Sequence, residues 1–479
     1  MNSLFYKEYQ FSIIILLGFL ISIFFSINNI KKHDQNVIDS NGDQYHKMIK
    51  YDPYRYLSHG NEIKDQINSG KDFFETGKQH YTKYLPARIA AAYYYFFDLN
   101  LFQDAEKKKI NLGIHLPYLL FQCFFYFFSI TFLYLSANKI LNKNTCLGLI
   151  LFLCLEPTIN QYHGSFWSES YLFSIMIILI GLIIRPNHNM VSAFFIGLLL
   201  GFLSLQKEYA IFYIIPVIFY FIFFYKYKFL KNIFFIVVGF ALMQCILGFN
   251  NYKRTGNFYI LASSTKLSLH THLISPVMQK KLNMGHYEFF EKIEGGPSLK
   301  WIEKNKIEYD PDHERLKVRK DIYGYRNAIK NEKDLKRFDE FIFNRTINYF
   351  FENPVSVIKY VAKNSFHITL LNPFHIYSDN KYRSGEAYYY SDEHDKLVLY
   401  RILYTLMIYI ICLIGFISMI KEKNYKLLIF STLSIIYFFL PVSWIGNTRN
   451  FVPCLIFMSF FFAFGIDKIL SLKKTRLIY

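Results

Sequence analysis

The chain of 479 residues is 53% hydrophobic and 20% aromatic, and it carries a formal net charge of +18. An ordinary soluble domain has a smaller share of apolar residues, so much of this chain is expected to lie in lipid. Membrane topology and attraction to anionic lipids explain the positive charge more simply than nucleic-acid binding does. Membrane lipids are therefore expected partners, and nucleic acid is not.

Apolar runs long enough to cross a hydrocarbon core of about 30 Å, which takes roughly 20 helical residues, recur about ten times. They lie near residues 11–28, 115–137, 145–159, 168–184, 191–206, 209–225, 232–250, 397–420, 427–444 and 451–467. The first run is long for the apolar part of a signal peptide and no small-residue cleavage site follows it, so we expect a retained anchor. The pattern predicts an all-α polytopic membrane protein.

These runs divide the chain into five parts. The parts are a first transmembrane anchor at 1–28, a first exported loop with an acidic motif and a surface helix at 29–114, transmembrane helices two to seven at 115–250, a large exported and mostly helical loop at 251–396, and the last three transmembrane helices with a basic cytoplasmic tail at 397–479. Lysines and arginines of the short connections fall on one side if ten spans alternate. Because positive loops stay in the cytoplasm, we expect both termini there and both long loops exported.

The first loop contains the segment DSNGDQYHKMIKYDPYRYLSHGNEI, with Asp39, Asp43 and Asp52. Downstream, KYLPARIAAAYYYFFDLNLF alternates small and aromatic residues at helical spacing. This spacing predicts a helix that lies along the membrane surface and holds the acidic segment near the headgroups. An aspartate in a polar loop also commonly caps a turn or is solvated, and that alternative stays open.

A second polar cluster lies where the fourth predicted span begins, in HGSFWSESYLF, with His163, Trp167 and Glu169. An acid at the mouth of a helix is costly if it faces lipid, and it is usually functional if it faces the other helices. The alternative is an interfacial carboxylate in the first turn, stabilised by the positive end of the helix dipole.

Two lone cations lie on the same face, Lys207 in LSLQKEYAIF and Arg449 in SWIGNTRNFVPCLIF. Each could simply extend its charge to the bilayer surface. Carboxylates beside such cations also suit transfer from a lipid-linked phosphate donor. The cations neutralise the leaving phosphate, while a carboxylate deprotonates the incoming hydroxyl.

The chain resembles the polytopic glycosyltransferases of the GT-C class, which include bacterial relatives of the protein O-mannosyltransferases and of the lipid A aminoarabinose transferase. DPYRYLSHGNEI is similar to the Asp and Tyr of that family's first loop, which map to Asp52 and Tyr56. GDQYHKM, with Asp43 and Tyr45, competes for the same role. FWSESYLF resembles the family's acid at the start of the fourth span, which maps to Glu169.

Three later segments extend the resemblance over most of the chain. A small-residue span of the family that ends in a basic residue is similar to GLLLGFLSLQKEYAIFYIIP. The family's exit from the seventh span is similar to GFNNYKRTGNFYILASST. The closing Arg and Pro of its last spans are similar to those in NTRNFVPCLIFMSFFFAFGI. The corresponding residues here are Lys207 and Glu208, then Asn251, Arg254 and Gly256, then Arg449 and Pro453.

The resemblance implies a GT-C-like bundle and a glycosyltransferase of the bacterial inner membrane, with its active site on the periplasmic face. The implied reaction is an inverting transfer that needs no metal and no cofactor, from a polyprenyl-phosphate-sugar donor to a glycolipid, glycan or protein acceptor. Asp52 or Asp43 is the implied general base, and Glu169 orients the acceptor or sugar or shares the proton chemistry. Lys207 and Arg449 are implied to clamp the phosphate. The other implied substrate-binding residues are Tyr56, Tyr45, His163, Glu208 and Arg254.

Other functions remain open at this point. No paired-acid motif follows the first span, and the spans are fewer than in the longest family members, so donor sugar and acceptor are undetermined. An O-antigen polymerase or ligase would also present a large exported loop and cationic positions. A non-catalytic transporter or flippase would show inverted repeats, which this sequence lacks. His270 and His272 have no further ligands at suitable spacing, so no metal site is expected.

Overall fold

The computed structural model describes residues 2–33, 36–38, 44–46, 52–77, 84–104, 109–110, 112–160, 162–163, 166, 168–225, 230–260, 267, 269–285, 288–313, 316–317, 320–366, 369, 392–445 and 451–476. In this part of the chain, six helices are long and apolar enough to cross a membrane, and further apolar helices are shorter. Every apolar run of the sequence forms a helix. The number of helices that cross the bilayer, about ten by our count, stays a prediction.

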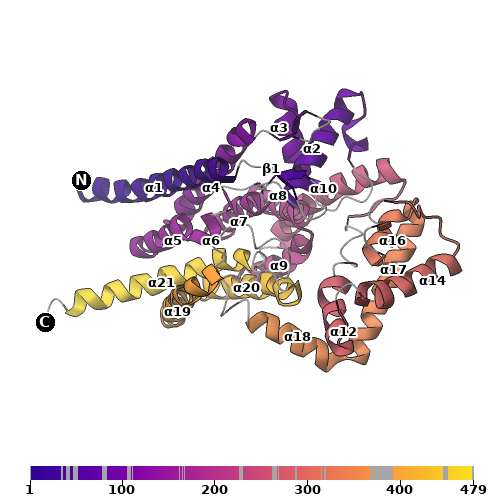
Figure 1. Ribbon diagram of the computed structural model, residues 1–479. Helices are drawn as coiled ribbons and strands as arrows, with labels where there is room; N and C mark the ends of the chain where they lie inside the picture. Colours follow the sequence, from indigo (N-terminus) through magenta and orange to yellow (C-terminus); the bar gives the residue numbers. More distant parts are fainter. Residues whose placement is uncertain are drawn as a thin grey trace.

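A bundle of apolar helices makes up the larger part of the structure (Figure 1). Its helices are α1 (Asn2–His33), α4 (Leu116–Ala137), α5 (Lys143–Leu155), α6 (Pro157–Asn160), α7 (Glu169–Ile183), α8 (Met190–Gln206), α9 (Ile214–Tyr225), α10 (Leu230–Thr255), α19 (Asp392–Lys421), α20 (Tyr425–Ile445) and α21 (Val452–Arg476). A 3-10 segment, η3 (Glu208–Tyr213), leads into α9. Both termini lie at the same end of the bundle.

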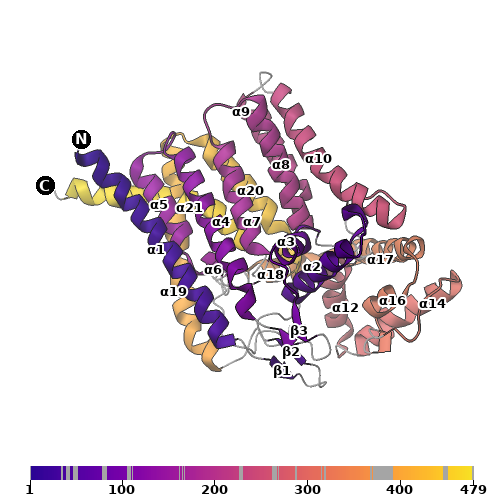
Figure 2. The same cartoon turned by 90° about the horizontal axis from the view of Figure 1, so that it is seen from above.

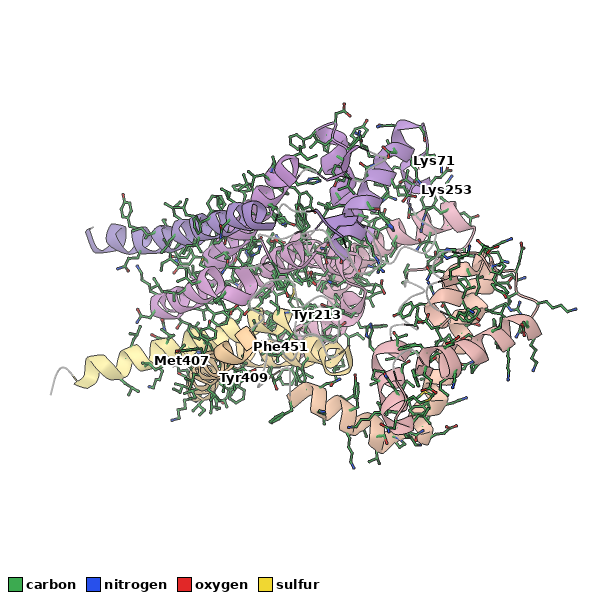
Figure 3. The ribbon with its side chains drawn as sticks, viewed as in Figure 1. Lys71, Tyr213, Lys253, Met407, Tyr409 and Phe451 are labelled. Atoms are coloured by element: carbon green, nitrogen blue, oxygen red, sulfur yellow. The ribbon has the colours of Figure 1, made fainter. Side chains whose placement is uncertain are left out.

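The helix α7 is the most deeply buried helix of the bundle, because nearly all of its residues are apolar and face other helices. The outer helix α1 instead exposes Ile13, Leu16, Leu20 and Phe24 on one side. Exposed apolar side chains in such a stripe are typical of a surface that lies against lipid. The side chains of Tyr213 and Phe451 lie within the bundle (Figure 3), where the Tyr213 hydroxyl is 2.7 Å from Ser434 Oγ.

Glycines bring two helix pairs into close contact. A Cβ atom at Gly197 of α8 would overlap the carbonyl oxygen of Ile236 on α10. A Cβ atom at Gly415 of α19 would overlap the carbonyl oxygen of Phe461 on α21 in the same way. Because helices in lipid associate through close packing rather than through the hydrophobic effect, these contacts fix the order of the helices.

The first long loop lies across the end of the bundle opposite the termini, which we call the loop end (Figure 2). Its elements are β1 (Asn36–Ile38) paired with β2 (Gln44–His46), α2 (Asp52–Asn68), η1 (Phe73–Glu75), α3 (Tyr84–Phe96), β3 (Phe102–Asp104) paired with β4 (Lys109–Ile110), and η2 (Leu112–His115). The short strands are a small addition to a predominantly helical chain. The segment expected to form a surface helix is α3, and Phe96 and Phe97 at its end are 81% and 61% exposed.

The second long loop forms a small helical unit beside the loop end, which we call the loop domain (described residues between 267 and 366). It contains η5 (His270–Ile274), α12 (Ser275–Leu282), η6 (Phe289–Gly295), α14 (Gly296–Lys304), α16 (Ile322–Ala328), α17 (Glu332–Glu352) and α18 (Pro354–Phe366). Leu335, Phe338 and Ile342 of α17 are at the centre of its apolar core. A buried pair, Arg326 with Asp339, joins α16 to α17 through hydrogen bonds of 2.8 and 3.0 Å.

Candidate active site

The two charged positions that the sequence places in separate clusters, Glu169 and Lys207, meet in one buried ion pair. Lys207 Nζ lies 2.7 Å from Glu169 Oε1, and the two side chains are only 5% and 2% exposed. Glu169 is the first residue of α7, and Lys207 directly follows the last residue of α8. At Lys207 the backbone becomes extended, with φ −142° and ψ 119°, so α8 ends there.

A hydrogen-bonded network surrounds this ion pair. Ser168 Oγ donates to Glu169 Oε2 over 3.4 Å, and Gln206 Nε2 donates to the Ser168 carbonyl oxygen over 2.5 Å. The hydroxyl of Tyr56 lies 3.3 Å from Ser168 Oγ. Since all of these side chains are buried and Tyr56 belongs to α2, the network ties the first loop to α7 and α8. Ser168 and Gln206 have no signal of their own in the sequence, although each is adjacent to a residue predicted for the site.

Three features of the fold surround the carboxylate of Glu169. Lys207 supplies an opposite charge, Ser168 supplies a hydrogen bond, and the N-terminus of α7 adds the positive end of a helix dipole. These contacts hold the carboxylate in one orientation, and this geometry suits an orienting role for Glu169.

His163 is buried in the turn between α6 and α7, beside the same network. Its Nδ1 lies 2.7 Å from Ser170 Oγ, and its ring contacts that of Tyr126 in a tilted arrangement, with 3.9 Å between centroids. Burial lowers the pKa of His163 to about 3, so the imidazole is neutral near pH 7. A neutral imidazole can orient a hydroxyl but cannot neutralise a phosphate.

A cationic region lies at the loop end of α10. Arg254, predicted for substrate binding, donates from Nη2 to Asn251 Oδ1 over 2.6 Å. Gly256, with φ +75°, follows α10, and its N–H donates to the Tyr252 carbonyl oxygen, which explains the glycine at this helix end. Glu208, the first residue of η3, is half-buried.

Arg88 of α3 is also part of this cationic region, and no feature of the sequence distinguishes it as a site residue. Its guanidinium is buried and donates to Thr76 Oγ1 over 2.6 Å and to the Thr76 carbonyl oxygen over 3.0 Å. Burial and the positive charge of Arg254 both lower the pKa of Arg88. The proximity of two arginines concentrates positive charge where the first loop contacts α10, a suitable environment for a phosphate.

Several predicted site residues lie outside the described side chains. Asp52 is the first residue of α2, four residues before Tyr56, but the structure describes only its backbone. Tyr45 lies in β2, where its backbone pairs with Val37. Asp43 and Arg449 lie outside the described residues. The choice between Asp52 and Asp43 as general base therefore stays a prediction.

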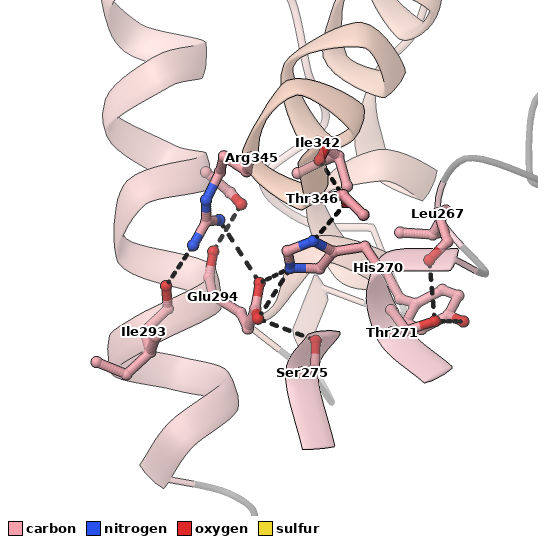
Figure 4. Close-up of polar contacts among 11 residues, drawn as sticks. Leu267, His270, Thr271, Ser275, Ile293, Glu294, Ile342, Arg345 and Thr346 are labelled. Atoms are coloured by element: carbon pink, nitrogen blue, oxygen red, sulfur yellow. Dashed lines mark hydrogen bonds and ion pairs between the residues drawn. The ribbon is translucent and has the colours of Figure 1, made fainter. Parts of the chain in front are cut away.

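His270 and His272 of the loop domain do not form a joint site. The imidazole of His270 is buried between Glu294 and Thr346, with Nε2 3.0 Å from Glu294 Oε2 and Nδ1 2.8 Å from Thr346 Oγ1 (Figure 4). Arg345 and Ser275 contact the same carboxylate at 3.5 and 3.0 Å. This network joins η5, η6 and α17. Among the described residues, no group of three or more His, Cys, Asp or Glu side chains is arranged to hold a metal ion.

Comparison with solved structures identifies a similar architecture. The archaeal oligosaccharyltransferase AglB from Archaeoglobus fulgidus, in complex with an inhibitory peptide and a dolichol-phosphate, aligns with 99% of this chain at 14% identity and a TM-score of 0.50. The chain has a GT-C-like fold. This confirms the fold expected from the family resemblance, and the alignment covers 52% of the length of the AglB chain. No protein-family model matches the chain, and no curated protein matches it.

Proposed function

We propose that this chain is an integral-membrane glycosyltransferase that moves a sugar from a lipid-phosphate-linked donor to a lipid, glycan or protein acceptor. The observation that carries the proposal is the buried Glu169–Lys207 pair, tied through Ser168 to Tyr56 of the first loop. The likeness in fold to AglB, whose structure contains a dolichol-phosphate and a peptide, supports a lipid phosphate as donor and a separate acceptor.

The general base comes from the first loop. Asp52 precedes Tyr56 by four residues in α2, which is about one helical turn. Residues at this spacing lie on the same face of a helix, so the contact of Tyr56 with Ser168 supports a position for Asp52 near the start of α7. Asp43 is the competing base.

The reaction is a direct displacement. The acceptor oxygen attacks the anomeric carbon, its proton passes to the aspartate, and the bond from that carbon to the phosphate oxygen breaks. The leaving lipid phosphate takes the bonding electrons, and nearby cations stabilise its charge. Lys207, whose Nζ lies against Glu169, acts here together with Arg449. Arg254 extends the positive region toward the first loop.

The placement in the cell follows from the same reasoning. Both ends of the chain lie at one end of the bundle, which supports an even number of crossings. The positive charges of the short connections then favour the cytoplasm for both termini. The loop end would then face the periplasm of a bacterial inner membrane. Glu169 orients the sugar or the acceptor there. His163 contributes a neutral contact to the substrate, and Glu208 contributes an acidic one.

The test compares wild-type protein with Asp52→Asn, Asp43→Asn and Glu169→Gln in cells at matched expression. Turnover of the polyprenyl-phosphate sugar and the mass of surface glycans are measured together. The matched control is Asp65→Asn, because Asp65 is an exposed acid on the same helix as Asp52.

We expect Asp52→Asn to abolish most transfer, with donor accumulating and the glycan losing the mass of one sugar. Asp43→Asn should have a smaller effect, and Asp65→Asn should behave as wild type. Equal donor levels and equal glycan masses in all five strains would refute this function for surface glycans.

A further inference from the structure

The outer face of α18 is apolar although this helix belongs to the loop domain and not to the bundle. Val355 and Ile358 are 62% and 60% exposed, and Phe366 is 60% exposed. These positions, with Ala362 between them, follow helical spacing and form one stripe. The outer face of a helix on a water-soluble unit is ordinarily polar.

The opposite face of α18 already has its packing partners. Val357 is 1% exposed and packs with Ile274 and Val277 in a small apolar cluster of the loop domain. The exposed stripe is therefore additional apolar surface, beyond what the fold of the domain requires.

The turn before α18 extends this surface. Phe351, near the end of α17, is 73% exposed. Leu282, at the end of α12, is 46% exposed, and the neighbouring Lys281 donates to Asn353 Oδ1 over 2.7 Å. The end of α12 and the turn between α17 and α18 thus form one continuous corner, which we call the apolar corner.

The apolar corner is also basic. Its exposed cations are Lys280 and Lys281 of α12 and Lys359 and Lys363 of α18, and Glu352 at the end of α17 is an exposed acid beside them. Lysines beside exposed apolar side chains are the composition of helices that lie in the surface of an anionic bilayer.

The position of the corner in the fold favours lipid over a protein partner. The helix α18 contacts α20, and the outward face of α20 exposes Ile436 and Leu440, so the apolar surface continues onto the bundle. Along the bundle axis, α18 lies at the level of α2 and α3 in both views (Figures 1 and 2). The helix α3 ends in the exposed Phe96.

We infer that the apolar corner docks into the surface of the bilayer at the loop end. The apolar stripe of α18 enters the outer hydrocarbon, and the lysines contact anionic headgroups. This contact fixes the loop domain against the membrane independently of sugar transfer.

The test measures the surroundings of position 358 in the full-length protein. Each variant carries Cys245→Ser, because Cys245 is the exposed cysteine of the chain. Ile358→Cys, or Val355→Cys as a second position, is labelled with an environment-sensitive fluorophore in nanodiscs that contain phosphatidylglycerol. The matched control is Glu340→Cys, an exposed polar position on α17 of the same domain.

We expect labels at 358 and 355 to show blue-shifted emission, quenching by doxyl-labelled lipid and protection from aqueous iodide. The label at 340 should show emission typical of water, little quenching by doxyl-labelled lipid and strong quenching by aqueous iodide. Adding Lys359→Gln and Lys363→Gln should increase the access of iodide to position 358. Equal iodide quenching at 358, 355 and 340 would overturn the inference. Protection from both quenchers would overturn it too, because it would indicate a protein cover.

Discussion

Removing the charge of Lys207 is expected to destabilise the protein strongly, because Glu169 would then be a buried carboxylate without its cation. At the observed separation of 2.7 Å, and with an effective dielectric constant of about 20, the attraction within the pair is roughly 6 kcal/mol. Both side chains are almost completely buried, so solvent screens this attraction little. Breaking a buried pair on one side commonly costs about 3–5 kcal/mol, and we expect Lys207→Met to lower the free energy of unfolding by that amount.

The assay is unfolding of the purified protein in mixed micelles as the mole fraction of dodecyl sulfate is raised, followed by intrinsic fluorescence. Four proteins form a double-mutant cycle: wild type, Glu169→Gln, Lys207→Met and the double variant. The double variant should be more stable than either single variant, because it contains no unpaired buried charge. Lys292→Met serves as a control, because Lys292 forms an exposed ion pair with Glu288 at 2.9 Å and such pairs contribute little.

The reasoning fails if Lys207→Met and Lys292→Met are equally stable. It fails as well if the effects of Glu169→Gln and Lys207→Met simply add in the double variant, since additivity means that the two charges do not interact.

Three further predictions concern other parts of the chain. Tyr56→Phe should lower stability by about 1 kcal/mol through its lost hydrogen bond and should reduce kcat more than KM, measured in detergent with purified donor. Burial alone would raise the pKa of Glu294, but hydrogen bonding and positive charge from His270 lower this pKa below 4.5. The ionised carboxylate therefore stabilises the fold above pH 4.5, and this stabilisation is lost as the pH falls further. Hydrogen exchange of η6 should then rise at low pH in wild type but not in Glu294→Gln. Gly197→Val should prevent close contact of α8 with α10 and reduce the yield of folded protein, whereas Gly296→Ala, at an uncrowded glycine, should not.

The sequence was sufficient to predict the helices, because an apolar run of bilayer length can cross the membrane only as a helix that satisfies its own backbone hydrogen bonds. The helix α3 was predicted for a similar reason, from its alternation of small and aromatic residues. The strands β1 to β4 were not predicted, since segments of two or three residues have too few positions to show a period. Long elements were therefore predicted correctly from the sequence, whereas the shortest elements were not.

The candidate site was predicted in part. Glu169 and Lys207 attracted attention singly, because a charge at the edge of an apolar run is unexpected. Their pairing depends on how α7 and α8 pack, and they are 38 residues apart in the chain. Arg88 was missed because an arginine in an amphipathic surface helix is ordinary, and only the fold shows that its guanidinium is buried.

The shortness of α7 has a consequence for the surrounding membrane. Its 15 residues span roughly 22 Å, whereas a hydrocarbon core is about 30 Å thick. Neighbouring helices such as α4, with 22 residues, are long enough to cross the whole layer. At least one end of α7 therefore lies within the depth of the hydrocarbon core, enclosed by the surrounding helices. Polar groups at such an end need partners from the protein itself, as Glu169 has in Ser168 and Lys207, because no bulk water is available at that depth.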